Sequence, residues 1–154
     1  MKTTIVLEGA SQLRVKLDAL PEKVQRRAVR ESVRSALKLY LNAAKRNARS
    51  VVGGKMGALL ASTLYLKASK RTRRAYYGML ALFHTGRQQS GGLVWTSKKG
   101  KRSFIPAAIE YGHGRHKAEA ARPFLKPAFE QTKAQMVDTL GRELGAKIEE
   151  EAAK

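Results

Sequence analysis

The chain has 154 residues, of which 43% are hydrophobic, and it contains no cysteine. This length predicts a single domain over residues 1–154, and the missing thiols exclude disulfide scaffolds, thiolate metal sites and cysteine nucleophiles. No apolar run approaches the length that crosses a bilayer, so we expect a soluble protein without a membrane partner.

The net charge is strongly positive and unevenly distributed. Its formal value is +19, from 31 Lys and Arg against 12 Asp and Glu, and residues 32–109 hold sixteen basic residues and no acidic one. A field of this kind attracts polyanions or an acidic protein surface. The alternative is a solvated surface that only keeps the protein soluble, and the asymmetry favours a real anionic partner.

The N-terminal part of the chain predicts a short strand followed by helices. Residues 3–8 are typical of a strand, whereas Leu13, Leu17 and Leu20 have the spacing of a short helix. The clearest element is a long helix from Pro21 to about Arg49, because apolar residues recur along it three or four positions apart.

The middle of the chain favours strands. Residues 63–66 and 75–83 are rich in aromatic and apolar side chains that suit a partly buried strand. Residues 93–95 and 103–105 flank the loop 97–102, which predicts a hairpin with a basic tip.

A second long helix is predicted from about Phe124 to Glu150, where apolar residues again share one face. Pro106 cannot donate to a β-ladder, so we expect the strand before it at an edge or a bulge. The predicted fold class is therefore α+β, with an antiparallel β-sheet packed by a long helix in the N-terminal half and a long C-terminal helix.

The segment before the last helix has a distinctive pattern of glycine and proline. Gly112 and Gly114 allow backbone angles that a strand cannot hold, so Ile109–Tyr111 is predicted to end a strand. Pro123 and Pro127 fit only outside a helix or in its first turn. A turn and a rigid helix start are therefore expected here.

The side chains around this helix start are expected to fasten it to an apolar surface. Leu125 and Phe129 are assigned to packing within the chain, whereas the role of Phe124 stays open between packing and contact with a neighbouring subunit. We also hypothesise that Arg122 pairs with Glu110 and so ties the strand end to the helix start.

These segments resemble the neck, or tail-completion, proteins of long-tailed bacteriophages, which include lambda minor tail component Z-like and gene-ten-product-like connector proteins. Members share a Val/Ile-Glu-x-Gly strand end, an Arg-Pro-Phe-Leu-x-Pro-Ala helix entry and often a Gly-x-Leu-x-x-Ser element, which residues 57–62 match. The Pro and Thr that usually precede that element are absent, since residues 51–56 read Val-Val-Gly-Gly-Lys-Met. The family-motif residues, with structural or interface roles by resemblance, are Glu110, Tyr111, Gly112, Arg122, Pro123, Phe124, Leu125, Pro127 and Phe129.

The resemblance implies a structural virion component of the head–tail neck, assembled in the cytoplasm of a host bacterium. Such a protein forms a homo-oligomeric ring that completes the tail and joins it to the head connector. Its partners would be portal-associated head-connector proteins and the tail tube or tail terminator, with phage DNA as a further candidate.

No catalytic constellation is present, so we expect neither an enzyme nor a cofactor. The sequence lacks a nucleophile elbow, a phosphate-binding loop and a His-Glu-x-x-His pattern. Glu110, His113, His116 and Glu119 lie three residues apart, but two glycines among them favour a flexible loop over a metal site.

Composition alone supports a second function, that of a general basic nucleic-acid-binding protein without catalytic activity. Two basic turns suit phosphates of any sequence. The aromatic residues beside them have two alternative roles, stacking on bases or filling the core face of the sheet, and the second is favoured for Tyr76, Tyr77, Trp95 and Phe104. The basic residues match no recognised nucleic-acid motif, which favours the neck interpretation. The candidate contacts with an anion, DNA or an acidic partner are Lys70, Arg71, Arg73, Arg74, Lys98, Lys99, Lys101 and Arg102.

Overall fold

The computed structural model describes residues 10–68, 79–83, 93–96, 98, 100, 102–112 and 120–153. The predicted strand at residues 3–8 and the basic turn at residues 70–74 lie outside these ranges.

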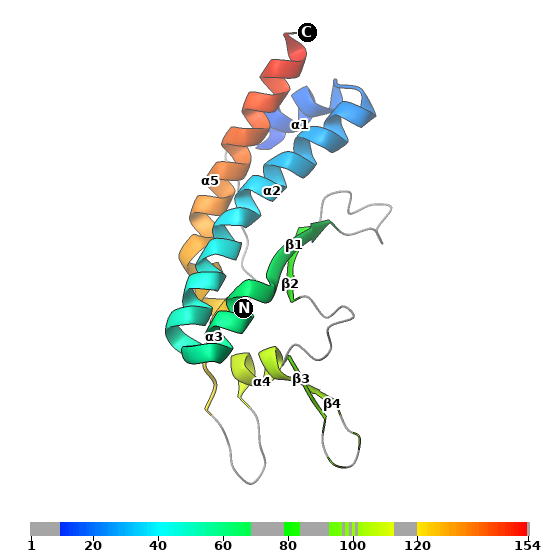
Figure 1. The fold of residues 1–154 in the computed structure, drawn as a ribbon. Coiled ribbons are helices and arrows are strands. Elements are labelled where there is room, and N and C mark those ends of the chain that lie inside the picture. The colour runs from blue at the N-terminus through cyan, green and yellow to red at the C-terminus, as the bar shows by residue number, and fades with distance from the viewer. Residues whose placement is uncertain are drawn as a thin grey trace. The chain divides into compact units, whose positions relative to one another are not determined.

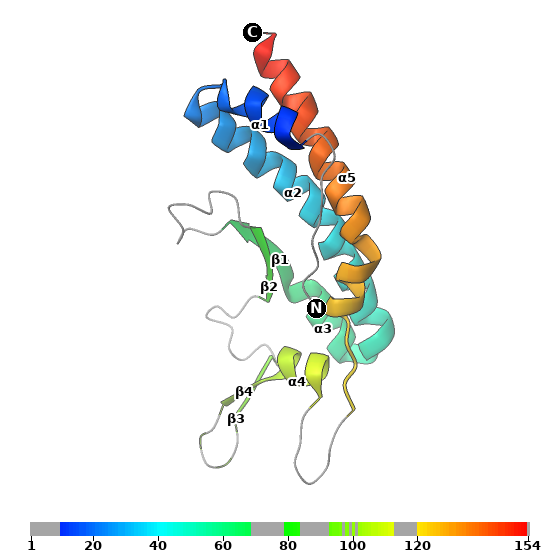
Figure 2. The same cartoon turned by 180° about the vertical axis from the view of Figure 1, so that it is seen from behind.

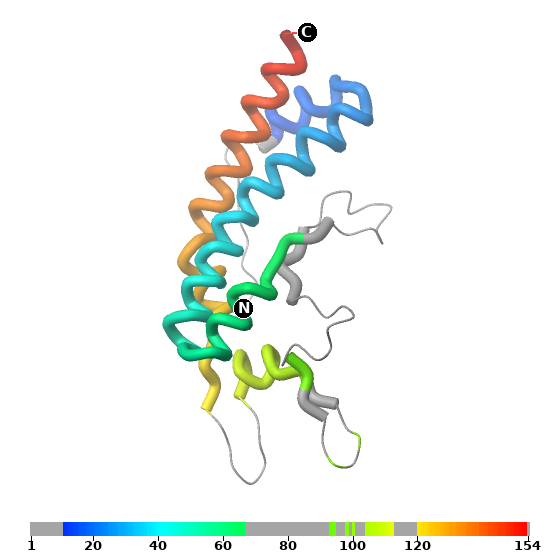
Figure 3. The backbone as a smooth tube through the Cα atoms, in the orientation of Figure 1, coloured from blue at the N-terminus to red at the C-terminus, as the bar shows by residue number. Residues whose placement is uncertain are grey.

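Helices account for most of the described chain (Figure 1), and the same path is traced as a tube in Figure 3. They are α1 (Ala10–Asp18), α2 (Glu22–Asn47), the π-helix η1 (Ala48–Val52), α3 (Gly54–Thr63), α4 (Ile105–Tyr111) and α5 (Leu125–Ala152). The short N-terminal helix and both long helices predicted from the sequence are confirmed. Pro21 immediately precedes α2, and its carbonyl accepts hydrogen bonds from the Val24 and Gln25 amides.

The predicted α+β fold with one antiparallel sheet between two helices is wrong. The described strands are three to five residues long and form two separate pairs, β1 (Leu64–Ala68) with β2 (Met79–Phe83) and β3 (Val94–Thr96) with β4 (Arg102–Phe104). The hairpin prediction holds locally, because β3 and β4 are antiparallel with Trp95 opposite Ser103. The molecule is predominantly helical, with these pairs as minor elements.

The segment around Pro106 accounts for part of this error. The sequence predicted a strand that ends at Ile109–Tyr111, yet Ile105–Tyr111 is the helix α4. Pro106 lies in its first turn, where the missing N–H has no intrahelical acceptor, rather than at a strand edge or bulge. A short apolar run does not distinguish a buried strand from a buried helix, so the sequence pattern alone could not decide between them for residues 105–111.

The chain divides into two compact units, one of residues 1–40, 66–80 and 132–154 and the other of residues 41–65 and 81–131. The boundary cuts α2 between Tyr40 and Leu41 and α5 between Gln131 and Thr132. The single domain expected from chain length stays a prediction.

The first unit contains α1 with the N-terminal part of α2 and the C-terminal part of α5. Within it, α2 and α5 lie side by side in the views of Figures 1 and 2. Ala28, Ser32 and Ala36 are buried at four-residue spacing on α2, and the Ser32 hydroxyl donates to the Ala28 carbonyl at 2.9 Å. Small buried residues of this kind favour close approach of neighbouring helices.

The second unit is built around a core of alanines, two leucines and one phenylalanine. Its fully or nearly fully buried side chains include Ala43, Ala44, Ala48, Leu60, Ala61, Leu64, Phe124 and Ala128. The Ile105 amide donates to the Leu93 carbonyl at 2.9 Å, which connects the β3–β4 hairpin to the start of α4. The motif residues of α4 and α5 lie in this unit.

Candidate functional site

Glu110 joins the two motif segments through backbone hydrogen bonds. Its side chain is buried, and its Oε2 accepts from the amides of Phe124 at 2.8 Å and Leu125 at 3.0 Å. Its Oε1 accepts from the Lys126 amide at 2.9 Å. The first amides of a helix have no intrahelical acceptor, and the positive end of the helix dipole lies there. One carboxylate therefore caps the start of α5, an arrangement called the Glu110 clamp below.

The backbone on either side explains how this carboxylate reaches α5. Gly112 ends α4 with φ of 74°, an angle that L side chains rarely adopt. The Arg122 amide then donates to the Ile109 carbonyl at 2.8 Å, so the chain returns beside the end of α4. Pro127 lies in the first turn of α5, where an amide is not needed, as the sequence predicted.

The predicted ion pair between Arg122 and Glu110 is not formed. Arg122 is exposed, and its Nη1 donates to the Val52 carbonyl at 3.4 Å, while both oxygens of Glu110 are bound to amides. The sequence correctly placed a connection between these segments and assigned it to the wrong donor. Opposite side-chain charges suggested the Arg122 guanidinium as the donor to Glu110. The donors are instead the backbone amides at the start of α5, which have no acceptor within the helix.

The hydrophobic roles at the start of α5 also differ from the prediction. Phe124, whose role the sequence left open, is 0% exposed, and Phe129, which was assigned to packing within the chain, is 38% exposed. Leu125 and Pro123 are half-buried, and Tyr111 of the same motif is 82% exposed. Phe124 is therefore the residue that anchors the helix start, because its ring lies wholly inside the second unit.

Asn47 is a contributor that the sequence analysis missed. Its Nδ2 lies 3.4 Å from both the Phe124 carbonyl and the Gln131 Oε1, so the end of α2 contacts the first turns of α5. No pattern near residue 47 marks this contact, since it spans more than seventy residues of sequence.

Gly57, the first residue of the third family-like element, lies at a close crossing of two helical segments. A Cβ at this position would lie 2.5 Å from the Ala48 carbonyl oxygen and 3.3 Å from the Arg49 Cα. Both are backbone atoms, so only glycine allows α3 to approach η1 this closely. The unusual Gly53-Gly54 sequence before it adopts positive φ angles of 72° and 52°.

The predicted basic turn at residues 97–102 is partly described. Lys98 is exposed, and Arg102 begins β4 opposite Thr96, while Phe104 is 38% exposed. The remaining predicted contacts lie outside the described residues: Lys70, Arg71, Arg73, Arg74, Lys99 and Lys101.

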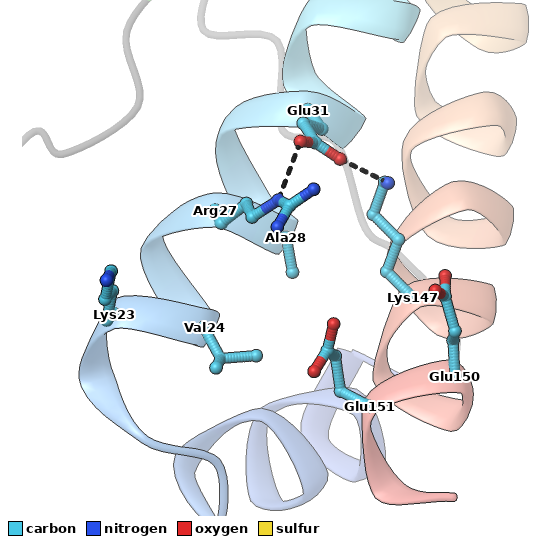
Figure 4. A pocket seen from close by; sticks show the side chains of 8 residues that line it. All are labelled: Lys23, Val24, Arg27, Ala28, Glu31, Lys147, Glu150 and Glu151. Carbon is cyan, nitrogen blue, oxygen red and sulfur yellow. Dashed lines mark hydrogen bonds and ion pairs between the residues drawn. The ribbon is translucent and has the colours of Figure 1, made fainter. Parts of the chain in front are cut away.

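A shallow pocket of about 360 Å³ lies in the first unit between α2 and α5 (Figure 4). Glu31 is at its edge, where it accepts from Lys147 Nζ and, at 3.1 Å, from Arg27 Nε. The hydrogen bond from Lys147 and then that from Arg27 lower the pKa of the Glu31 carboxyl. The pocket lining is Lys23, Val24, Arg27, Ala28, Glu31, Lys147, Glu150 and Glu151.

This pocket is explained by contacts within the chain. The Glu31 carboxylate is paired with both Arg27 and Lys147. Among the described residues, no buried side-chain N or O lacks a hydrogen-bond partner. The i,i+4 spacing of Arg27 and Glu31 was visible in the sequence, whereas the contact with Lys147 was not.

The described residues also limit other kinds of site. They hold no group of three His, Cys, Asp or Glu that could bind a metal ion, and His113, His116 and Glu119 lie outside them. In the same part of the chain, no helix has the length and hydropathy of a membrane span.

No protein-family model, curated protein or solved structure matches this chain.

Proposed function

We propose that this protein is a non-catalytic structural component of the head–tail junction of a long-tailed bacteriophage. It forms a homo-oligomeric ring that completes the tail and joins it to the head connector. The observation that carries the proposal is the ordered resemblance of residues 57–62, 109–112 and 122–128 to family motifs.

The Glu110 clamp supports treating these motifs as one unit. Glu110 lies in one motif segment and the proline-containing start of α5 lies in the next. The two segments are directly linked, because the Glu110 carboxylate accepts hydrogen bonds from three amides at that start. Gly57 has a similarly specific role at the contact of α3 with η1. These contacts support a structural role for the shared residues.

Exposed motif residues offer a surface for a neighbouring subunit. Tyr111 is 82% exposed next to the buried Glu110, and Phe129 is 38% exposed next to the buried Ala128. Exposed aromatic side chains are common anchors of protein interfaces. In a closed ring, such a patch would meet a different patch on the adjacent copy.

The first test is the composition and assembly of particles from the phage or prophage that encodes the chain. Quantitative mass spectrometry should find it in intact virions at a fixed, low ratio to the portal protein. Deletion of its gene should leave filled heads and separate tails unjoined in electron micrographs, and the wild-type gene supplied in trans should restore joining.

A matched pair of variants separates assembly from folding. Tyr111→Ala should lower the yield of joined particles without changing thermal stability, whereas Val15→Ala, at a 72% exposed residue outside the motif, should leave both unchanged. Intact, infectious virions that lack the chain would refute the neck assignment. Full joining by the deletion strain would refute it equally.

A further inference from the structure

The outward face of α2 in the first unit is almost uniformly cationic. Every exposed residue of this helix between Glu22 and Tyr40 is charged, and Glu22 is the one acid among them. The six exposed basic residues are Lys23, Arg26, Arg27, Arg30, Arg34 and Lys38. They lie opposite the buried Ala28, Ser32 and Ala36, because helical residues about two apart project to opposite sides.

Four of these cations have no anionic partner within the described part of the chain. Glu22 pairs with Arg26, and Glu31 pairs with Arg27 and Lys147. The unpaired four are Lys23, Arg30, Arg34 and Lys38, defined here as the cationic ridge. Their spacings of seven, four and four residues place them in one stripe along the helix.

The ridge opposes folding rather than assisting it. Arg30 and Arg34, and then Arg34 and Lys38, are like charges at i,i+4, a spacing at which repulsion destabilises a helix. A surface that serves only solubility usually mixes both signs. An anionic partner would remove this repulsion on binding.

We infer that the cationic ridge binds the phosphate backbone of double-stranded DNA without sequence preference. The ridge extends for about 22 Å, at about 1.5 Å per residue, and B-DNA presents a phosphate charge about every 1.7 Å of its axis. Several phosphates of one duplex therefore lie within reach of the four side chains. Arginine forks and lysine ammonium groups both bind phosphate oxygens.

Two other polyanions fit this face less well. An acidic protein surface is usually held by aromatic or aliphatic anchors, and α2 exposes none between Glu22 and Tyr40. Single-stranded nucleic acid is held by aromatic side chains on which bases stack, and this face has none exposed. The inference rests on the ridge alone and does not require the chain to be a neck component.

The test compares DNA binding by the full chain with that of two variants that each lose four positive charges. The ridge variant is Lys23→Gln, Arg30→Gln, Arg34→Gln and Lys38→Gln. The control is Lys16→Gln, Arg46→Gln, Lys126→Gln and Arg142→Gln, which changes exposed residues of the same types elsewhere. Fluorescence anisotropy with a labelled random-sequence duplex of about 30 base pairs is followed from about 50 to 200 mM salt.

The wild-type affinity should fall steeply with salt, and the ridge variant should lower the slope of log K against log salt by about three to four. The control should lower it by less than about one, and circular dichroism should show the same helix content in all three proteins. Equal losses in both variants would overturn the inference, because net charge alone would explain them. The inference would also be overturned if the wild-type chain did not bind the duplex at low salt, or if it bound polyglutamate with the same affinity as the duplex.

Discussion

At the scale of single residues, Glu110 shows how a charged side chain serves a helix that lies elsewhere in the sequence. Its two oxygens accept from three amides at distances between 2.8 and 3.0 Å, and only 6% of the residue is exposed. Without it, three donors would be left without this acceptor, one at the buried Phe124 and two at the part-buried first turn of α5. The buried donor is the most costly, since water does not replace its lost acceptor.

Glu110→Gln tests this cap. Glutamine keeps one acceptor oxygen but directs an NH₂ group at a backbone donor, so we expect a loss of about 1–3 kcal/mol in the free energy of unfolding. Urea denaturation followed by circular dichroism measures it. Asp138→Asn, at an exposed position on α5, is the control and should change stability by less than about 0.5 kcal/mol. Equal stability of both variants would show that the cap contributes little.

Two glycines predict opposite outcomes for the same substitution. At Gly57 a new Cβ would lie 2.5 Å from a backbone oxygen, whereas at Gly145 the nearest atom, Leu13 Cδ2, would be 3.7 Å away. We expect Gly57→Ala to destabilise by about 1–3 kcal/mol through overpacking. Gly145→Ala should stabilise by up to about 1 kcal/mol, because alanine is the better helix former. Thermal unfolding of the two variants checks the signs, and a Gly57→Ala variant at least as stable as the wild type would contradict the packing of α3 on η1.

At the scale of elements, the start of α5 depends on which aromatic residue is enclosed. Phe124 is 0% exposed and Phe129 is 38% exposed, so their truncations should differ in cost. We expect Phe124→Ala to lower the free energy of unfolding by about 3–5 kcal/mol, as for other buried phenylalanines, and Phe129→Ala by less than half as much. Chemical denaturation with matched m-values measures both. A larger effect at Phe129 would refute the assigned anchor.

The contact between α2 and α5 in the first unit predicts a modest dependence on pH. Lys147 and Arg27 lower the folded-state pKa of Glu31 below its unfolded value of about 4.3. The resulting stabilisation is present above that value and is lost as pH falls through the lower folded-state pKa. Because 42% of the Glu31 side chain is exposed, solvent screening keeps it below about 1 kcal/mol.

Glu31→Gln should therefore be slightly less stable than the wild type at pH 7, and the difference should shrink as pH falls below about 4. Urea denaturation between these pH values measures the trend. Glu149→Gln, at an exposed residue of α5, should show no such change. A difference between wild type and Glu31→Gln that grows toward acid pH would contradict the ion pair.

At the scale of the whole molecule, positive charge opposes the compact state. The formal net charge is +19, and four cations of the ridge lie close together on one helix without acidic partners in the described chain. Like charges repel over about 10 Å at 0.1 M ionic strength, so added salt should relieve part of this repulsion.

We expect the melting temperature to rise by about 2–5 °C between low and physiological salt. Differential scanning fluorimetry in sodium chloride measures this, and the four-residue ridge variant should respond less than the wild type. A melting temperature that falls with salt would show that the favourable ion pairs outweigh the repulsion.

The sequence predicted the helices well and the fold class poorly. The long helices were evident because apolar residues keep helical spacing over many turns, and α2 and α5 indeed run through Glu22–Asn47 and Leu125–Ala152. The segment 105–111 was assigned partly to a strand because a short apolar run has no decisive period. Residues 105–111 are helical, and the described strands form two separate short pairs in place of the one predicted sheet.

By itself, the sequence determined the charge imbalance, the two long helices, the proline-bounded start of the last helix and the turn at Gly112. Each depends on composition, local backbone preference or a regular period. Only the tertiary structure decided that Glu110 binds amides instead of Arg122, that Phe124 rather than Phe129 is enclosed, and that Gly57 lies against Ala48. These outcomes depend on which distant groups meet, and local pattern carries no information about that contact.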